Sequence, residues 1–135
     1  MPESMAQDAA KRAADNAQDP RVRVKLIGAL QLHGPANVTR DAVLQILDSS
    51  APEDVRRRAA YALSRVVGQD DIKTLTKAIA DEPDAYVTAR YAFTLNKLTG
   101  MIQTVDAVGK SKPGEREAFI EKWRNAPREK AAGSQ

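Results

Sequence analysis

The sequence of 135 residues contains no cysteine and a single histidine. Without cysteine the chain can have no disulfide framework, no thiolate zinc site and no thiol nucleophile. His33 is expected at the end of a helix, and without cysteine companions it does not indicate a zinc site. Aromatic residues are also scarce, at 4% of the chain, whereas alanine is abundant. This composition favours closely packed helices over a β-sheet.

Long apolar runs are absent, so the sequence predicts neither a signal peptide nor a membrane-spanning helix. Hydrophobic residues make up 42% and charged residues 29%, which is typical of one soluble domain, and we expect a cytoplasmic protein. The formal net charge of +3 is small. A nucleic-acid-binding protein of this size usually has a larger or more clustered positive charge, so the distribution of charge matters more than its sum.

Three segments of the chain are similar to one another: DPRVRVKLIGALQLHG, PEDVRRRAAYALSRVVG and DAYVTARYAFTLNKLTG. Their valines lie 33 and 32 residues apart, at Val22, Val55 and Val87, and a leucine follows each valine by eight residues. Each segment closes on a glycine, the residue that often forms the left-handed turn after a helix. These glycines are Gly34, Gly68 and Gly100. The spacing of apolar residues inside each segment is helical.

A shorter helix is predicted before each of these segments. The first carries a face of alanines near the N-terminus, the second is expected to be capped near Thr39, and the third near Asp70. The repeating unit is therefore a helix, a turn and a second helix. It occurs about three times, over residues 5–34, 38–68 and 70–100.

The repeat is lost after Gly100, where the sequence predicts a different terminal element. A last helix is expected within 113–127, with Phe119, Ile120 and Trp123 on its buried side. Such an element would cover the last apolar face of a stack of helix pairs. Residues 1–127 are thus predicted to form a single domain, and residues 128–135 a disordered tail.

With its segments aligned, the sequence resembles the HEAT-repeat family, especially short bacterial HEAT-like repeats also found in relatives of phycobilisome lyases. The resemblance rests on VRRRAAYAL and, more loosely, on VRVKLIGAL and YVTARYAFTL. It covers residues 19–100, or from residue 5 if the first helix is included. It implies an all-α fold, a right-handed α-solenoid of about three antiparallel helix pairs with a C-terminal capping helix. The second helices of such a solenoid line a surface that typically binds other macromolecules.

The resemblance also implies a role for the arginine that follows each valine. In the family this arginine commonly pairs with an aspartate in the turn between the helices of a repeat. Arg23 and Arg56 match the arginine, and Asp48 and Asp81 occupy such turns. The third repeat has Thr88 instead, so the expected series of pairs is incomplete there.

Basic and aromatic residues recur at equivalent positions of the second helices, next to helices that are slightly negative. Arg57 is expected to point outward, whereas Arg56 lies at the flank of the buried face. This recurrence predicts a surface that binds a macromolecule. The predicted binding residues are Lys25, Arg57, Arg58, Tyr61, Arg65, Arg90, Phe93 and Lys97. The alternative is that these long side chains only solvate the helices and cover apolar neighbours.

No residue pattern predicts catalysis, a metal site or a cofactor site. The sequence GKS at residues 109–111 lacks the glycine that a phosphate-binding loop has five positions earlier, where Thr104 stands. Paired carboxylates stand at predicted helix starts, where capping explains them.

We therefore expect a non-enzymatic module that binds a protein partner, with an acidic segment as one form of that partner. The alternative is a nucleic-acid-binding protein with a basic concave face, and a lyase or chaperone for a chromophore rests on the family name alone. A monomer without membrane association is favoured. Because three helix pairs are near the minimum for a stable stack, part of a longer array is a further alternative.

Overall fold

A computed structural model describes residues 1–127, and the tail predicted at 128–135 lies outside the described residues. The described chain consists of helices joined by short connections and has no strand, which confirms the predicted all-α class. Its contacts divide it into two compact units, Met1–Val67 and a second unit that begins at Gly68. The prediction of a single domain over 1–127 stays a prediction.

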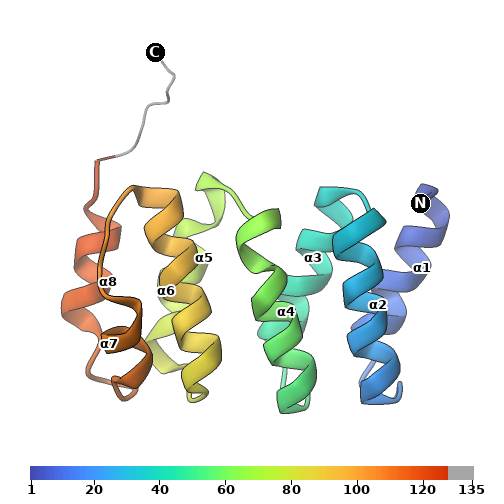
Figure 1. The fold of residues 1–135 in the computed structure, drawn as a ribbon, viewed down its shortest axis with the longest axis horizontal. Coiled ribbons are helices and arrows are strands. Elements are labelled where there is room, and N and C mark those ends of the chain that lie inside the picture. The colour runs from blue at the N-terminus through green and yellow to red at the C-terminus, as the bar shows by residue number, and fades with distance from the viewer. Residues whose placement is uncertain (128–135) are drawn as a thin grey trace. The chain divides into compact units, whose positions relative to one another are not determined.

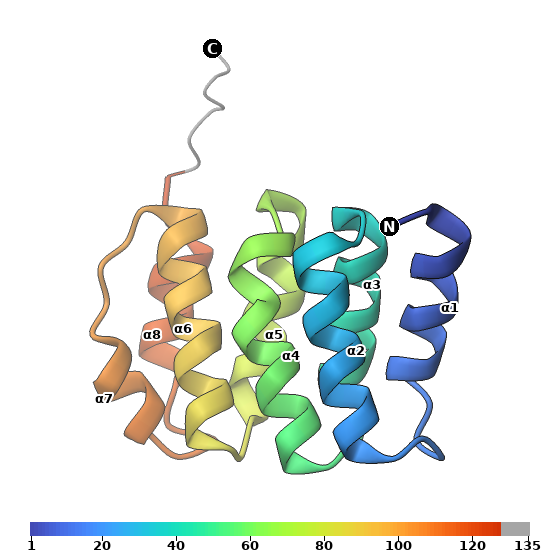
Figure 2. The same cartoon turned by 45° about the vertical axis from the view of Figure 1, so that its right-hand side comes forward.

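The first unit contains two antiparallel helix pairs. The first pair is α1 (Glu3–Ala13) with α2 (Pro20–His33), and the second is α3 (Ala36–Leu47) with α4 (Glu53–Val66). Within this unit α1 packs against α3 and α2 packs against α4, so first helices and second helices form two layers (Figures 1 and 2).

The core of the first unit lies between its two layers. Val55, Ala59 and Leu63 follow one face of α4 and are completely buried. Leu30 occupies the equivalent of Leu63 on α2 and is also buried. Alanines on α1 let this helix approach its neighbours closely, because a methyl group is the smallest side chain that still covers apolar surface. The buried members of that alanine face are Ala6, Ala9 and Ala13.

The arginine after each valine caps the end of the preceding helix in this unit. The Arg23 Nε donates a 2.7 Å hydrogen bond to the carbonyl oxygen of Ala13, at the end of α1. The Arg56 Nη2 donates a 3.0 Å bond to the carbonyl of Leu47, at the end of α3. The last carbonyls of a helix have no partner within it, so each guanidinium satisfies a group that would otherwise be costly to bury. Burial also lowers the pKa of Arg23.

Two predictions about helix ends need correction. Thr39 is not the cap of α3, which begins at Ala36; it is buried one turn inside, where its hydroxyl donates to the carbonyl of Leu30. Only Gly100, of the three repeat glycines, adopts the left-handed conformation, with φ of 78°. Gly34 and Gly68 have negative φ, because the chain leaves those helices in an extended conformation.

The second unit begins with a repeat of the same kind. A short 3-10 turn, η1 (Gln69–Asp71), leads into α5 (Ile72–Asp81), which pairs with α6 (Ala85–Thr99). The cap predicted near Asp70 is not found, since α5 begins after Asp71 without a side-chain cap bond. The Asp71 carboxylate instead accepts the backbone N–H of Gly68, at the start of η1. The Asp84 side chain caps α6 by accepting the N–H of Val87.

Two further helices complete the second unit, α7 (Val105–Lys110) and α8 (Glu117–Arg124). α7 packs against α6, beside which Figure 2 shows it, and α8 packs against α5. The short α7 can lie close to α6 because Gly109 has no side chain. A Cβ at that position would lie 3.2 Å from the Cβ of Ala89, closer than side chains normally pack.

Trp123 forms the centre of the packing around α8. Its side chain is completely buried, and its indole Nε1 donates a 2.9 Å hydrogen bond to Asn96 Oδ1 on α6. The Asn96 side chain is itself bonded to the backbone N–H and carbonyl of Gln103, in the loop before α7. The predicted role of Trp123 as a core residue of the last helix therefore agrees with the structure. Through Asn96, Trp123 is also connected to the loop before α7.

Arg116 caps the first helix of the third repeat, as Arg23 and Arg56 cap those of the first two. Its Nη1 donates to the carbonyls of Ile79 and Glu82, at 2.7 and 2.8 Å, at the end of α5. Arg116 is 2% exposed, and burial lowers its pKa. Thr88, which replaces the arginine, is too short to cap the whole end of α5 and donates to the Glu82 carbonyl alone at that end.

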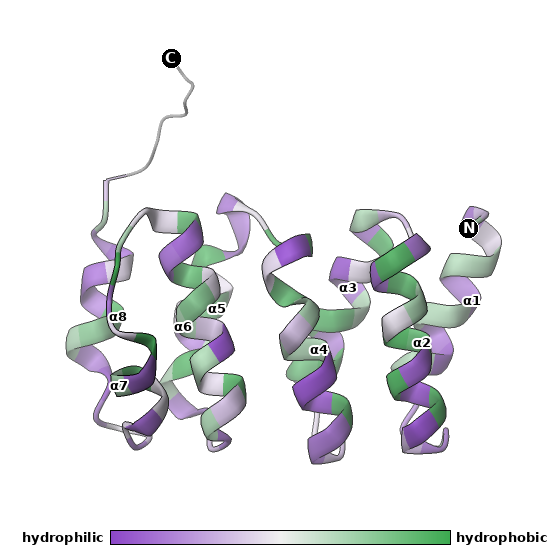
Figure 3. Cartoon of the chain, in the orientation of Figure 1, coloured by the Kyte–Doolittle hydropathy of each residue, from purple (hydrophilic) through white to green (hydrophobic). Residues whose placement is uncertain are grey.

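No helix between residues 1 and 127 is both long enough and apolar enough to span a membrane. Figure 3 shows polar and apolar residues alternating along the helices of both units.

Candidate functional site

The predicted binding residues of the first unit are centred on a stack of two side chains on α4. The guanidinium of Arg58 lies over the ring of Tyr61, with 5.1 Å between its central carbon and the ring centroid. Residues three positions apart share one face of a helix, so the helix itself places the two side chains together. Tyr61 is 50% exposed, so the guanidinium of Arg58 and the aromatic ring together form a cationic and aromatic surface that faces solvent.

Arg58 also reaches the neighbouring helix α2. Its Nη2 lies 3.4 Å from the place where Gly28 would carry a Cβ, so the guanidinium extends to the side of α2 at Gly28. The Arg58 Nη1 is buried and has no hydrogen-bond partner. Arg58 thus packs beside Gly28 and Tyr61, and within residues 1–127 no carboxylate forms an ion pair with it.

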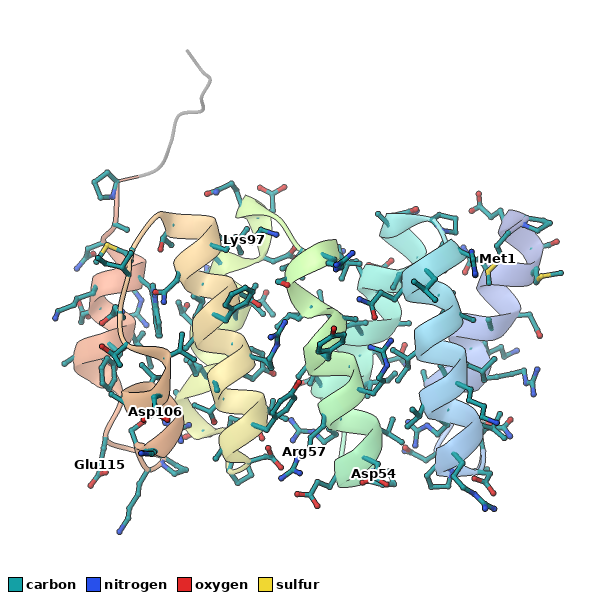
Figure 4. The ribbon with its side chains drawn as sticks, in the orientation of Figure 1. Met1, Asp54, Arg57, Lys97, Asp106 and Glu115 are labelled. Carbon is teal, nitrogen blue, oxygen red and sulfur yellow. The ribbon has the colours of Figure 1, made fainter. Side chains whose placement is uncertain are left out.

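The other basic residues of this surface are more exposed. Lys25 on α2 and Arg65 on α4 are both exposed. Arg57 also points to solvent, as predicted, but it forms an ion pair of 2.5 Å with Glu53 one turn earlier. Figure 4 shows Arg57 projecting from the N-terminal half of α4, the same half that carries Asp54. Arg57 therefore contributes less net charge to the surface than the sequence suggests.

The second unit carries the same arrangement on α6. The Arg90 guanidinium lies over the Phe93 ring at 4.8 Å from the centroid, and Phe93 is 44% exposed. Lys97 is exposed near the C-terminal end of α6, where Figure 4 labels it. Each unit thus presents an arginine stacked on a solvent-exposed aromatic ring, with a further basic residue one turn beyond the ring.

The charge of these helices is positive because acidic residues are rare on them. α2 and α6 contain no aspartate or glutamate, and α4 has its two, Glu53 and Asp54, in the first turn. Carboxylates in a first turn are stabilised by the helix dipole, which explains why they stand there. From Val55 onward, α4 contains only basic charged residues.

Two residues of the surface were not predicted from the sequence, Gly28 and Leu32 on α2. They occupy the positions that hold Tyr61 and Arg65 on α4, and Phe93 and Lys97 on α6. Leu32 is 75% exposed. The signal was present in the aligned repeats, since both residues break a pattern that the other two repeats share.

Two hollows lie away from these surfaces. A groove of about 600 Å³ between α1 and α3 is lined by both polar and apolar residues, and its charged members are Lys11, Asp15 and Asp41. A smaller pocket of about 350 Å³ in the second unit lies beside Met101, Ile102 and Phe119. Neither hollow contains a predicted binding residue. Over residues 1–127, no group of three or more histidine, cysteine or acidic side chains is placed to hold a metal ion.

Comparison with known proteins identifies the repeats. The family model described as HEAT repeats matches residues 8–96, which is well over half of the chain. No curated protein and no solved structure gives a significant match. The matched residues include α2 and α4 in full and nearly all of α6, so the helices that carry the stacked arginines are part of the repeats. The chain belongs to the HEAT-repeat family.

Proposed function

We propose that this chain is a non-catalytic interaction module that binds a protein partner on the surfaces of α2, α4 and α6. HEAT repeats commonly mediate protein–protein interaction or scaffolding, and the family is typically non-catalytic. The observation that carries the proposal is the repeated stack of an arginine on an exposed aromatic ring, Arg58 on Tyr61 and Arg90 on Phe93. Arginine and tyrosine, together with tryptophan, are enriched among the residues that contribute most of the binding energy of protein interfaces.

The stacks are suited to binding because they are ordered before a partner arrives. An arginine held over a ring loses less conformational freedom on binding than a free side chain does. Its planar guanidinium can still present N–H groups to a carboxylate. The exposed rings supply apolar area beside that charge, which suits a protein partner better than a phosphate backbone, where contacts are mainly with oxygen atoms.

Removal of both stacks is expected to weaken binding of an acidic protein segment. We predict that the double variant Arg58→Gln, Arg90→Gln binds a fluorescently labelled, glutamate-rich peptide about tenfold or more weakly, because each arginine sits at the centre of a surface. Fluorescence anisotropy titration measures the affinity. Circular dichroism of the variant checks that its helices are intact.

A matched control removes two positive charges from α5, the first helix of the third repeat. Lys73 and Lys77 are exposed on α5, and the variant Lys73→Gln, Lys77→Gln is expected to change the affinity less than about twofold, as distant surface charges do. Equal losses in the two double variants would show non-specific charge attraction and contradict the proposal. So would tighter binding of duplex DNA than of the peptide, with the steep salt dependence of phosphate contacts.

A further inference from the structure

Leu32 is an apolar residue at a position where the other repeats are basic. It stands seven residues after Lys25 on α2, as Arg65 and Lys97 stand seven residues after Arg58 and Arg90. Its exposed fraction of 75% leaves most of its side chain in water. A single exposed leucine is ordinary on a protein surface. Here, however, it replaces a charge within a surface whose other members are cationic and aromatic.

Gly28 connects Leu32 to the stacked arginine of the same unit. The two residues lie on one face of α2, since four positions separate them. The Arg58 guanidinium rests against Gly28 and continues to the Tyr61 ring. Leu32 therefore lies one helical turn beyond the place where Arg58 touches α2. The surface of the first unit consequently combines a fixed cation, an exposed aromatic ring and an exposed aliphatic side chain.

The absence of a side chain at Gly28 leaves open space beside α2 next to the Arg58 guanidinium. A Cβ at position 28 would lie 3.4 Å from Arg58 Nη2, an ordinary van der Waals contact, so alanine would fit there. An aromatic ring at position 28, like those at the equivalent positions 61 and 93, would cover the contact. The first repeat thus differs from the other two at positions 28 and 32. Gly28 leaves its surface more open, and Leu32 makes its surface less charged.

We propose, building on the function proposed above, that the first unit binds an acidic protein segment that also carries a bulky apolar side chain. The apolar side chain contacts Leu32 and the Tyr61 ring, while carboxylates of the segment contact Arg58, Lys25 and Arg65. Charge complementarity selects the acidic residues, because α2 has no acidic side chain and those of α4 are confined to its first turn. The leucine selects the apolar residue, because contact removes both side chains from water.

A nucleic acid fits this surface less well. Phosphate oxygens gain nothing from Leu32, and the loss of a cation at that position removes one phosphate contact that an arginine or lysine would provide. Tyr61 could stack on an unpaired base, but its ring already has the Arg58 guanidinium on one side. The observations therefore favour a protein segment.

The test compares two glutamate-rich peptides of equal length and charge, one with two central leucines and the other with alanines in their place. We expect the wild-type chain to bind the leucine peptide about tenfold more tightly, as burial of two leucine side chains allows. The variant Leu32→Ser should lose most of this preference and keep the weaker affinity for the alanine peptide. The control variant Ile102→Ser removes another exposed aliphatic side chain, outside the second helices, and should keep the preference.

The outcomes separate this inference from the function on which it rests. Equal binding of both peptides, or an unchanged preference in Leu32→Ser, would overturn the inference and leave the protein-binding function intact. Failure of both peptides to bind, or a preference for duplex DNA, would overturn both. Self-association of the free chain that Leu32→Ser abolishes would identify a second copy as the occupant and would also overturn the inference.

Discussion

Replacement of Trp123 by alanine is expected to lower the free energy of unfolding by about 4 kcal/mol, the typical cost of truncating a buried tryptophan. The side chain is completely buried between α8 and α6. Alanine would leave a cavity there and would remove the hydrogen bond from the indole Nε1 to Asn96 Oδ1. Asn96 holds the loop before α7 through Gln103, so the loss would extend to that loop.

Urea unfolding followed by circular dichroism measures this effect. Fluorescence is unsuitable, because Trp123 is the only tryptophan in the chain. The variant Trp123→Phe keeps most of the apolar volume and loses the indole N–H, so a smaller loss of about 1–2 kcal/mol is expected. The control Phe119→Ala truncates an aromatic residue of the same helix that is only half-buried. A loss for Trp123→Ala no larger than that for Phe119→Ala would contradict the packing described for α8.

Replacement of Arg116 by methionine is expected to lower the free energy of unfolding by about 3 kcal/mol, because buried carbonyls would lose charged hydrogen-bond donors. Methionine approximates the length of the side chain, so a cavity contributes little. The carbonyls of Ile79 and Glu82 at the end of α5, and that of Ser111, would lose their bonds to the guanidinium. Hydrogen exchange should accelerate most in α5.

The matched control is Arg124→Met on the surface of α8. Arg124 is half-exposed and forms ion pairs with Glu117 and Glu121, and exposed pairs of this kind contribute at most about 1 kcal/mol. Trp123 fluorescence can follow unfolding in both arginine variants. Similar stabilities for Arg116→Met and Arg124→Met would show that Arg116 does not cap α5 in solution.

The helix pairs could be predicted from the sequence because the repeat encodes them locally. Val55 and Val87, 32 residues apart, are both completely buried, and so are the leucines eight residues after them. Contacts within its own helix and with the neighbouring helix are enough to bury each of these residues. Helix ends were less predictable. α2 is followed by Gly34 in an extended and not a left-handed conformation, and α3 begins directly after Pro35 and not at Thr39.

The role of Arg116 could not be predicted from the repeats. The sequence showed that Thr88 stands where the other repeats have an arginine, but the arginine that caps α5 instead, Arg116, lies outside the repeating segments. Its carbonyl partners are 34 and 37 residues away along the chain, and no periodic pattern connects them. Contacts of this kind depend on how the loop after α7 folds, and spacing alone does not encode that path.

The candidate surface was predicted in part. The three-residue spacing of Arg58 and Tyr61, and of Arg90 and Phe93, places each pair on one helix face, which the sequence shows directly. The stacking itself depends on side-chain conformation and, for Arg58, on a glycine of the neighbouring helix. The ion pair of Arg57 with Glu53 also lowers the importance of a residue that the sequence placed at the centre of the arginine triplet.

The most direct test of the central claim is to map where a bound peptide changes the amide NMR spectrum of the chain. Titration with the glutamate-rich peptide is predicted to shift the amide signals of α2, α4 and α6 most strongly, in particular those near Gly28, Tyr61 and Phe93. Signals of the first helices α1, α3 and α5 should change little. Shifts centred on those first helices, or on the pocket beside Met101 and Ile102, would contradict the account.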